Sequence, residues 1–386
     1  MSEQYLRETP FHDRIAAVAS AQSWERWQGH ITAVTLGGMD REYFAIRNSA
    51  SVYDVSPLIK YRITGADAAR FVDRLITRDV ARCAIGQAYY TPWCDDDGKV
   101  IEDGTLFRLG KADFLLNAAL HNLHWLRDTA YGFDVTIEDV SAEIAGLSVQ
   151  GPLAQTVLIA MGIGGLERLA HMRLAETRLD DRPMRVSRTG FTGDLGYELW
   201  IRPGDASWLW DRLMAAGALY NVLPIGSAAL NHARIEAGFI LVNVDFISAT
   251  YALRPSQKRS PYELGLGWAV NLKKDGYFIG KRALLAERKA ATPRRALVGL
   301  EIDGRKPAVD AFIYAGKREV GRTTSAIWSP TLKKNIAIAS IAGDQALPGT
   351  ELGIEIWHPK ELKIERSMVG CRVVHRPFYD PPRKKA

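Results

Sequence analysis

The pattern of secondary-structure signals changes near residue 290, and this change constrains the fold more than any other feature of the sequence. Before it, stretches with helical spacing alternate with short runs typical of strands. After the charged stretch Ala283–Ala290 and the boundary-like segment Ala291–Arg295, the chain consists mostly of short strands separated by glycine and proline. We therefore predict an α+β region over residues 1–290 and a small all-β domain over residues 291–386.

Several segments of the first region carry individual signals. Residues Asp13–Trp27 place apolar side chains at helical spacing and predict an N-terminal helix, and the turn Asp95–Gly98 lies between two β-like runs and predicts a hairpin or meander. Further helices and strands are expected in alternation, which favours antiparallel sheets covered by helices. These are helices over Arg41–Asn48, Asp67–Leu75, His121–Tyr131, Pro152–Met161 and Ala206–Ala216, and strands over Lys60–Thr64, Asp113–Asn117, Glu143–Gln150, Met184–Arg188 and Tyr197–Ile201.

The composition argues against several classes of protein. The longest apolar runs fall well short of the roughly 20 residues that span a bilayer, and the first twenty residues do not resemble a secretory signal. We therefore expect a soluble, cytoplasmic protein without a membrane partner. The three cysteines lack CxxC spacing and the eight histidines form no HExxH or HxH cluster, so we expect neither a disulfide framework nor a metal site.

The net charge of +6 raises the question of a nucleic-acid partner. Lysine and arginine are scattered among 44 acidic residues, except in the C-terminal run Arg383–Lys385. We interpret this run as a solvated tail and expect no nucleic-acid partner. A modest positive field favours an anionic small ligand instead.

A series of short motifs, in collinear order along nearly the whole chain, resembles the folate-binding glycine cleavage T-protein (aminomethyltransferase) family. Each motif alone is a weak signal, and together they are a strong one. They are Thr9–Phe11, Phe44–Ala50, Val52–Ser56, Gln150–Pro152, Ser187–Gly193, Arg234–Gly238, Glu263–Trp268, Phe278–Lys281, Ser329–Asn335 and Pro377–Pro381.

The resemblance implies a three-lobed ring with two intertwined α+β lobes and a C-terminal β-barrel, with tetrahydrofolate bound in the central hole. Related folds serve glycine cleavage, folate domains of sarcosine and dimethylglycine oxidases, and O- or S-demethylases. The fold therefore indicates the cofactor better than the substrate.

Glu102 and Asp103 are adjacent on a predicted strand, so their side chains point to opposite faces and only one carboxylate can face a pocket. The family pattern has an acidic pair here whose second member lies beside the folate. The resemblance thus makes Asp103 the candidate catalytic residue, with a turn residue before Gly104 as the alternative. A carboxylate there can hold or move a proton and stabilise developing positive charge. We place Glu102 at the surface or behind the site.

Glu198 interrupts a strand of aromatic and apolar residues, which is costly unless its carboxylate has partners or water. By resemblance it grips the guanidine-like edge of the pterin through paired hydrogen bonds. Arg234 matches a folate contact, either to the glutamate tail or as a brace for Glu198. The structural alternative is an ion pair on a helix surface with Glu236 or another neighbour.

Three further residues are assigned to the cofactor site by resemblance. Tyr90 matches a tyrosine near the ligand, and Leu116 matches an apolar contact on the neighbouring strand. Aromatic residues in strands are more often part of the core, so this alternative stays open for Tyr90. Phe191 stands where the family usually has tyrosine, so stacking on the ligand is retained while a phenol hydrogen bond is lost.

Departures from the family pattern fall where the one-carbon donor should approach. Segments Trp27–Thr32 and Phe239–Phe246 replace the usual residues. An extended segment with apolar side chains around Asn243 and Asp245 would offer apolar contacts on one side and polar anchors on the other, so we predict that these two residues bind the donor substrate. A buried strand with a different core is the alternative.

These observations favour an enzyme that moves a methyl group from a small O-, S- or N-methylated metabolite to tetrahydrofolate. The alternative within the family is a glycine cleavage T-protein that takes an aminomethyl group from a lipoyl carrier protein. A third possibility is a folate-binding module without transfer chemistry, and the presence of both Asp103 and Glu198 argues against it. No GxGxxG fingerprint follows an N-terminal strand, which argues against a flavin oxidase.

Overall fold

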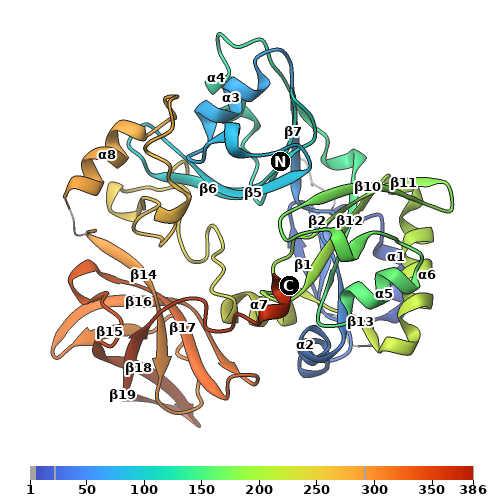
Figure 1. Cartoon of the computed structure of the whole chain (residues 1–386). Coiled ribbons are helices and arrows are strands. Elements are labelled where there is room, and N and C mark those ends of the chain that lie inside the picture. Colours follow the sequence, from blue (N-terminus) through green and yellow to red (C-terminus); the bar gives the residue numbers. More distant parts are fainter. Residues whose placement is uncertain (1–5, 21–22, 291–292, 386) are drawn as a thin grey trace.

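The computed structural model describes residues 6–20, 23–290 and 293–385. Three lobes surround a common centre (Figure 1). Two lobes are α+β and the third is a closed β-barrel, which confirms the fold predicted from the sequence. The predicted boundary between residues 290 and 291 adjoins residues 291–292, which lie outside the described residues.

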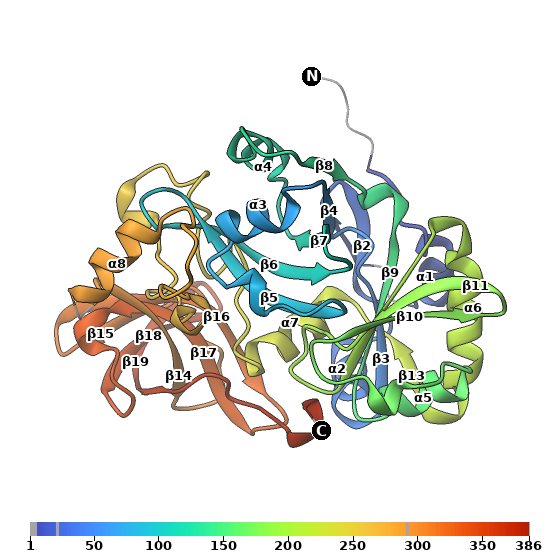
Figure 2. The same cartoon turned by 45° about the horizontal axis from the view of Figure 1, so that its top comes forward.

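The first lobe is built on a six-stranded sheet in the order β10-β11-β12-β9-β3-β13, next to the two-stranded sheet β1-β2. Helices α1, α5 and α6 pack on one face of the large sheet, and α2 and α7 pack on the other (Figure 2). The helices are α1 His12–Val18, α2 Met39–Asn48, α5 Ala154–Ala160, α6 Ala206–Gly217 and α7 Ser227–Glu236. The strands are β1 Ser23–Trp27, β2 His30–Thr35, β3 Ala50–Asp54, β9 Ala145–Gln150, β10 Leu174–Leu179, β11 Arg182–Ser187, β12 Gly196–Ile201 and β13 Val222–Pro224.

The second lobe interrupts the first in sequence, because the chain leaves the first sheet after β3 and returns to it at β9. Its five-stranded sheet has the order β5-β6-β7-β4-β8. Helix α3 shows why such segments form amphipathic helices: Ala68, Phe71, Val72 and Leu75 are all buried and follow the i, i+3, i+4, i+7 pattern. The strands are β4 Ile59–Thr64, β5 Gln87–Cys94, β6 Val100–Arg108, β7 Asp113–Ala118 and β8 Thr136–Asp139, and the helices are α3 Ala68–Leu75 and α4 Leu123–Thr129.

The predicted hairpin around Asp95–Gly98 is present as the antiparallel pair β5 and β6. Gly98 has φ +70°, a conformation that side-chain-bearing residues rarely adopt, which explains a glycine at the end of this turn. The prediction of one N-terminal helix over Asp13–Trp27 is wrong in its second half. Helix α1 ends at Val18, and Ser23–Trp27 is strand β1, paired with β2 through a turn whose central residues Gln28 and Gly29 both have positive φ.

The third lobe is a closed barrel with the strand order β14-β17-β16-β15-β18-β19. Its interior is apolar and includes Leu300, Ile313, Ile341 and Ile354, each buried. Helix α8, Lys281–Lys289, precedes it and packs beside the β5–β6 hairpin. The strands are β14 Arg295–Ile302, β15 Phe312–Ala315, β16 Arg318–Ser329, β17 Lys334–Ala342, β18 Glu351–Lys360 and β19 Lys363–Val374.

Candidate functional site

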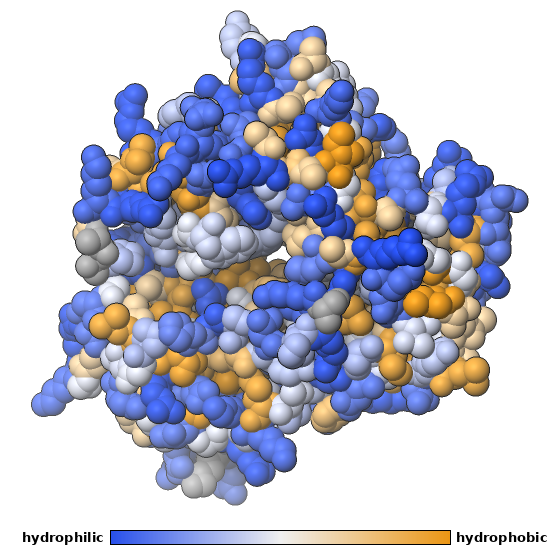
Figure 3. All heavy atoms as spheres, in the orientation of Figure 1, coloured by the Kyte–Doolittle hydropathy of each residue, from blue (hydrophilic) through white to orange (hydrophobic). Residues whose placement is uncertain are grey.

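A cavity of about 1440 Å³ lies where the three lobes meet. The space-filling view is hollowed at this centre (Figure 3). Strands β5 and β6 of the second lobe, β12 and α7 of the first lobe, and β14 of the barrel all contribute lining residues. The segments 238–242 and 374–377 complete the wall. Each lobe therefore supplies part of one shared site.

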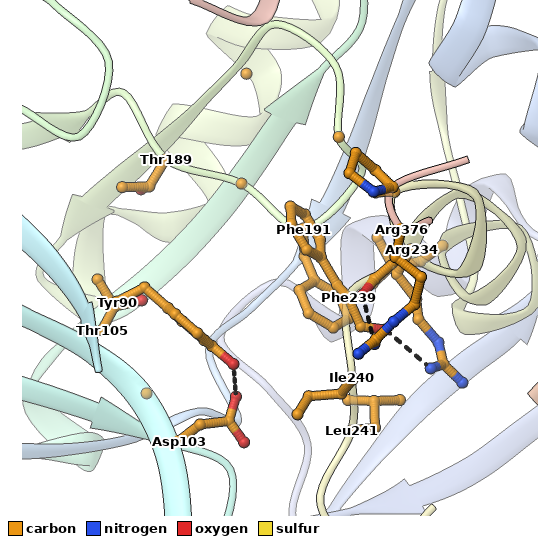
Figure 4. A pocket seen from close by; sticks show the side chains of 18 of the residues that line it. Tyr90, Asp103, Thr105, Thr189, Phe191, Arg234, Phe239, Ile240, Leu241 and Arg376 are labelled. Carbon is orange, nitrogen blue, oxygen red and sulfur yellow. Dashed lines mark hydrogen bonds between the residues drawn. The ribbon is translucent and has the colours of Figure 1, made fainter. Parts of the chain in front are cut away.

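Asp103 lies on β6 and faces this cavity (Figure 4). Its carboxylate accepts a hydrogen bond of 2.7 Å from the hydroxyl of Tyr90 on the neighbouring strand β5. Burial raises the pKa of Asp103 to about 6, and the hydrogen bond from Tyr90 opposes this shift. A carboxyl group with this pKa exchanges its proton near neutral pH, which is what a general acid or base requires.

Glu102 points to the other side of the same strand, as the alternation of side chains requires. Of the two positions predicted for Glu102, the surface is wrong, because its side chain is fully buried, whereas a position behind the site agrees with the structure. It accepts hydrogen bonds from the backbone N–H groups of Ala119 and Leu120 and from the amide of Asn122. Glu102 thus holds the loop that follows β7.

The pairing of β6 with β7 brings Asn117 next to this site. A Cβ atom on Gly104, the residue after Asp103, would lie only 2.2 Å from the carbonyl oxygen of Asn117, so glycine permits this close approach. Asn117 lines the cavity, and its buried Oδ1 has no hydrogen-bond partner among the described residues. Leu116, the residue predicted from the sequence, faces the opposite side and is fully buried in the core of the second lobe. The prediction for Leu116 is therefore off by one residue, because Asn117 is the residue that faces the cavity.

Aromatic rings form two stacked pairs in the cavity wall. Tyr90 and Trp268 are stacked with ring centroids 6.0 Å apart and planes at 21°. Phe191 and Phe239 are stacked at 5.5 Å and 23°. Trp268 is 65% exposed although it is large and apolar, which indicates a ring surface available to a ligand. The sequence comparison included Trp268 in a motif but gave it no role, since an isolated tryptophan does not reveal which side it exposes.

Glu198 on β12 also faces the cavity. Its carboxylate accepts hydrogen bonds from the hydroxyl groups of Thr189 and, at 3.4 Å, Ser187. Burial raises its pKa, while these hydroxyl groups and the charge of Lys60 lower it. Both hydrogen bonds reach the same oxygen, Oε2, so the other oxygen is available to a donor in the cavity.

Arg234 on α7 is 1% exposed and touches the cavity wall. Its guanidinium forms an ion pair of 2.6 Å with Asp245 and donates to the Ser325 hydroxyl at 2.7 Å. The predicted brace for Glu198 is therefore not what the structure contains. Of the structural alternative, an ion pair on a helix surface with Glu236 or another neighbour, the ion pair is present, but its partner is Asp245 and it is buried, while Glu236 pairs with Arg47.

Asp245 and Asn243 do not lie where the sequence predicted. Asp245 is 4% exposed and is not among the residues that line the cavity. Its carboxylate accepts hydrogen bonds from Arg234, from the Leu241 backbone N–H and from hydroxyl groups on β16. Asn243 occupies an exposed turn with φ +63°. The segment is not extended as expected, since Val242 and Phe246 are bridged across this turn. Only residues 239–242 of the segment line the cavity.

Arg376 is a site residue that sequence reasoning missed. It lines the cavity beside Phe239 and Arg234, on the side opposite Tyr90 and Asp103 in Figure 4. Its guanidinium donates to the carbonyl oxygens of Gly238, Leu264 and Leu297. Burial lowers its pKa. No sequence pattern marks it, because its partners are main-chain carbonyl groups on distant loops.

The C-terminal run is not a solvated tail. Arg383 forms a two-pronged ion pair with the buried carboxylate of Asp194, at 2.6 and 2.8 Å. Lys384 and Lys385 reach the cavity wall.

The described residues contain no group of three or more His, Cys, Asp or Glu side chains placed to hold a metal ion. Within the same part of the chain, no helix is long and apolar enough to cross a membrane.

Comparisons with known proteins agree with this geometry. Residues 11–274 match the family described as the GCVT N-terminal domain, and residues 295–380 match the glycine cleavage T-protein C-terminal barrel domain. An aminomethyltransferase of Geobacillus kaustophilus is 36% identical over 97% of this chain and 99% of its own length. One from Bacillus pumilus is 33% identical with the same coverage.

Two further comparisons widen this picture. A trimethylamine-oxide aldolase of Ruegeria pomeroyi is 33% identical over 98% of this chain, which matches 48% of that longer protein. The crystal structure of the glycine cleavage system aminomethyltransferase T from Bartonella henselae superimposes with a TM-score of 0.84 at 25% identity, covering 97% of this chain and 98% of that one. With both family domains matched and curated relatives aligned along nearly its full length, the chain belongs to the glycine cleavage T-protein (aminomethyltransferase) family.

Proposed function

We propose that this protein is a tetrahydrofolate-dependent transferase that takes a methyl group from a small O-, S- or N-methylated metabolite. The observation that carries the proposal is Asp103, a carboxyl group with a pKa of about 6 that faces the cavity between aromatic walls. A folate-binding module without chemistry would have no need for a carboxylate with a raised pKa at this position, since its burial is costly and no cation pairs with it among the described residues. The Tyr90 hydroxyl offsets part of that cost.

The cavity has groups that fit tetrahydrofolate. The available oxygen of Glu198 and the Oδ1 of Asn117 can accept hydrogen bonds from the pterin edge. The stacked pairs Tyr90–Trp268 and Phe191–Phe239 offer surfaces for flat rings. Tetrahydrofolate, when bound, supplies the nitrogen that accepts the one-carbon unit.

The residues of the chain would then act on orientation and protons. Glu198 holds the ligand in register, and the aromatic walls exclude water from the reacting centre. Asp103, held by the Tyr90 hydroxyl, would accept the proton that the amine loses as its new bond to carbon forms. The bond from the methyl carbon to O, S or N of the donor would break at the same time, and the demethylated donor would leave with that electron pair. The negative charge of Asp103 also stabilises positive charge at that centre.

The donor is the finer part of the proposal. Phe239, Ile240, Leu241 and Val242 line the cavity and make one wall apolar, which suits a small methylated compound. The competing function is aminomethyl transfer from a lipoyl carrier protein. It is favoured by the full-length similarity to proteins named aminomethyltransferase. The small donor has narrower support from the comparisons, a trimethylamine-oxide aldolase that is 33% identical to this chain and is matched over 48% of its own length.

The test is a product analysis. The enzyme is incubated with tetrahydrofolate and a panel of methoxy, methylthio, sulfonium and N-methyl compounds, and in parallel with an aminomethyl-lipoyl carrier protein. We expect 5-methyltetrahydrofolate from one class of free donor with no carrier present. Methylenetetrahydrofolate from the carrier, with no product from the panel, would establish the competing function. Saturating tetrahydrofolate, at about 100 times its Kd, should also stabilise the protein by roughly 2.7 kcal/mol.

A further inference from the structure

A chain of hydrogen bonds holds Glu198 from the side away from the cavity. The indole N–H of Trp200, also on β12, donates to the Ser187 hydroxyl at the end of β11, at 3.1 Å. The hydroxyl oxygens of Ser187 and Thr189 lie 2.7 Å apart, and the Thr189 hydroxyl donates to Oε2 of Glu198. Ser187 and Trp200 are buried, and Thr189 is the member of the chain that lies at the cavity (Figure 4).

The protons of this chain all point in one direction. An indole N–H can only donate, so the Ser187 oxygen accepts from Trp200. An ionised carboxylate can only accept, so the Thr189 proton points at Glu198, and the Thr189 oxygen is left to accept from Ser187. The Ser187 oxygen also lies 3.4 Å from Oε2 of Glu198. Hydrogen bonds of this direction favour the ionised form of the carboxyl group.

The Trp200 ring is fixed by its neighbours. In the sheet register it lies beside Gly146 on β9, where a Cβ atom would come within 2.6 Å of the indole ring, so glycine leaves the space that the ring occupies. Phe107 of the second lobe meets the ring edge-on, with centroids 6.4 Å apart and planes at 69°. Close packing on these sides keeps the indole N–H directed at Ser187.

One buried cation supports the ionised form of Glu198. Lys60 on β4 is fully buried, and its Nζ lies 5.8 Å from the centroid of the Trp200 ring. Its Nζ donates to two main-chain carbonyl oxygens, and it forms no ion pair within the described part of the chain. Its charge lowers the pKa of Glu198, against the effect of burial. The other titratable groups on this part of the cavity are Tyr53 on β3, whose pKa is raised by burial, and Asp103 on β6.

We propose that Trp200, Ser187 and Thr189 are positioning residues, which keep Glu198 a hydrogen-bond acceptor and leave its Oε1 directed at the cavity. This inference rests on the proposed binding of the cofactor by Glu198. A protonated Glu198 would place an O–H donor against the N–H donors of the pterin edge, whereas the ionised group accepts from them. Trp200 and Ser187 do not line the cavity, so they act on a ligand only through their hydrogen-bonded neighbours.

The experiment follows the ionisation of Glu198 without any ligand. The protein is produced with glutamate isotope-labelled at Cδ, and the carboxyl resonance that is missing in Glu198→Gln is titrated by NMR. Thr189→Val removes the donating hydroxyl at nearly constant size, and Thr189→Ser restores it. Ser187→Ala and Trp200→Phe remove the two earlier members of the chain. The matched control is Thr177→Val, on β10 of the same sheet and outside the cavity lining.

Tetrahydrofolate affinity is then measured by calorimetry across the same pH range for each variant. Melting temperatures verify that the variants are folded. If Trp200→Phe does not fold, Thr189→Val and Ser187→Ala are sufficient for the decision.

We expect Glu198 to titrate about one pH unit higher in Thr189→Val than in the wild type, because its ionised form loses a hydrogen bond. Ser187→Ala and Trp200→Phe should shift the titration in the same direction by about half as much, and their shifts should not add, since Trp200 acts through Ser187. Tetrahydrofolate affinity should fall by up to about tenfold in Thr189→Val at low pH, and the loss should shrink as pH rises. Thr189→Ser and the control Thr177→Val should titrate like the wild type.

An unshifted titration of Glu198 in both Thr189→Val and Ser187→Ala would overturn this inference. An affinity loss of the same size at every pH would do so too, because it would assign these residues to packing alone. A shifted titration in a protein that does not bind tetrahydrofolate would support the positioning of Glu198 and show that the proposed function is wrong.

Discussion

At the scale of single residues, the Asp103 carboxylate lowers the free energy of unfolding while it serves the proposed proton transfer. Its raised pKa means that the folded protein holds this proton more tightly than the unfolded chain does. The folded state is therefore penalised as pH rises from about 4 to about 6, and the full penalty is present above pH 6. Groups that weaken the fold in this way are concentrated at functional sites.

The change Asp103→Asn should therefore move stability and turnover in opposite directions. We expect the variant to be more stable than wild type by about 1–3 kcal/mol at pH 7 and equally stable below pH 4, because it lacks the buried charge. Its kcat should fall by roughly 100-fold or more. Thermal melting across pH, together with steady-state kinetics, measures both effects.

The pH dependence of the wild-type enzyme provides a second check on Asp103. If the carboxylate form accepts a proton, kcat should rise with pH through about 6, and this limb should be missing in Asp103→Asn. A variant with wild-type turnover and the same pH limb would show that Asp103 is a structural turn residue.

Substitution of Glu198 should weaken cofactor binding more than it lowers kcat, whereas substitution of Asp103 should mainly lower kcat. Glu198→Gln keeps the shape but replaces the charged acceptor, so a charge-assisted hydrogen bond to the cofactor becomes a neutral one. We expect tetrahydrofolate to bind about tenfold or more weakly, with a smaller effect on kcat. Calorimetric titration measures this, with Glu176→Gln as a control at an exposed ion pair on β10. Unchanged affinity would remove Glu198 from the binding site.

At the scale of elements, the pair Arg234–Asp245 joins helix α7 to strand β16 through Ser325 and Thr324. Both charged side chains are almost fully buried. Removing one partner of such a pair leaves an uncompensated buried charge, which is far more costly than loss of the pair's net attraction.

We therefore expect Asp245→Asn to lower the free energy of unfolding by about 3–5 kcal/mol without changing which donor the enzyme accepts. Urea denaturation and a donor panel test this. Asn243→Gly serves as the control, because glycine readily adopts the positive φ of that turn, and its effect should stay within about 0.5 kcal/mol. A change in donor preference in Asp245→Asn without loss of stability would restore the original prediction for this residue.

A comparison of predicted and observed elements shows which parts of the fold could be predicted from the sequence. Periodicity and turn signals predicted the β5–β6 hairpin, helix α3 and the all-β third lobe, because local spacing determines which side chains can be buried together. The same signal failed at Trp24 and Trp27, whose spacing fits a helix although they lie on β1. There the Gln28–Gly29 turn and pairing with β2 decide the structure.

The resemblance to the T-protein family located four of the predicted site residues correctly at the cavity, and their roles stay predictions. Asp103, Glu198, Tyr90 and Phe191 all face the cavity. Leu116 was misplaced because resemblance does not resolve which face of a strand meets the ligand when the register is unknown. Asp245 was misinterpreted because its partner Arg234 is eleven residues away, and a buried ion pair looks like two binding residues in a sequence.

At the scale of the whole molecule, a second buried polar network, centred on Glu236, joins the first lobe to the barrel. Glu236, at the end of α7, is fully buried and accepts from Arg47 on α2 at 2.6 and 2.9 Å. Its other oxygen accepts from the hydroxyl groups of Tyr43 and of Ser329 at the end of β16, both at 2.5 Å. The first lobe and the barrel are thus tied through one carboxylate. Because all three lobes line the cavity, we expect loss of these contacts to disturb the site.

The change Glu236→Gln tests this tie. A glutamine has one acceptor oxygen in place of two, and its NH₂ group would face the Arg47 guanidinium, a donor against a donor. The Tyr43 hydroxyl also needs an acceptor at this position. Burial and Glu236 raise the pKa of Tyr43 to about 12, so its hydroxyl stays protonated and remains a donor. We expect a loss of about 3–5 kcal/mol, and we expect the barrel and the α+β lobes to unfold in separate steps.

Urea denaturation followed by tryptophan fluorescence and by far-UV circular dichroism measures this coupling. In the wild-type protein the two signals should change together, whereas in Glu236→Gln they should separate and tetrahydrofolate binding should be lost with the first transition. Glu301→Gln is the matched control, because Glu301 is a partly exposed carboxylate on the barrel that pairs with Lys334 and Arg372, and its loss should cost less than about 1 kcal/mol. A single sharp transition in Glu236→Gln at the wild-type midpoint would show that the lobes are held together by their apolar contacts alone, and that the site does not depend on the central carboxylate.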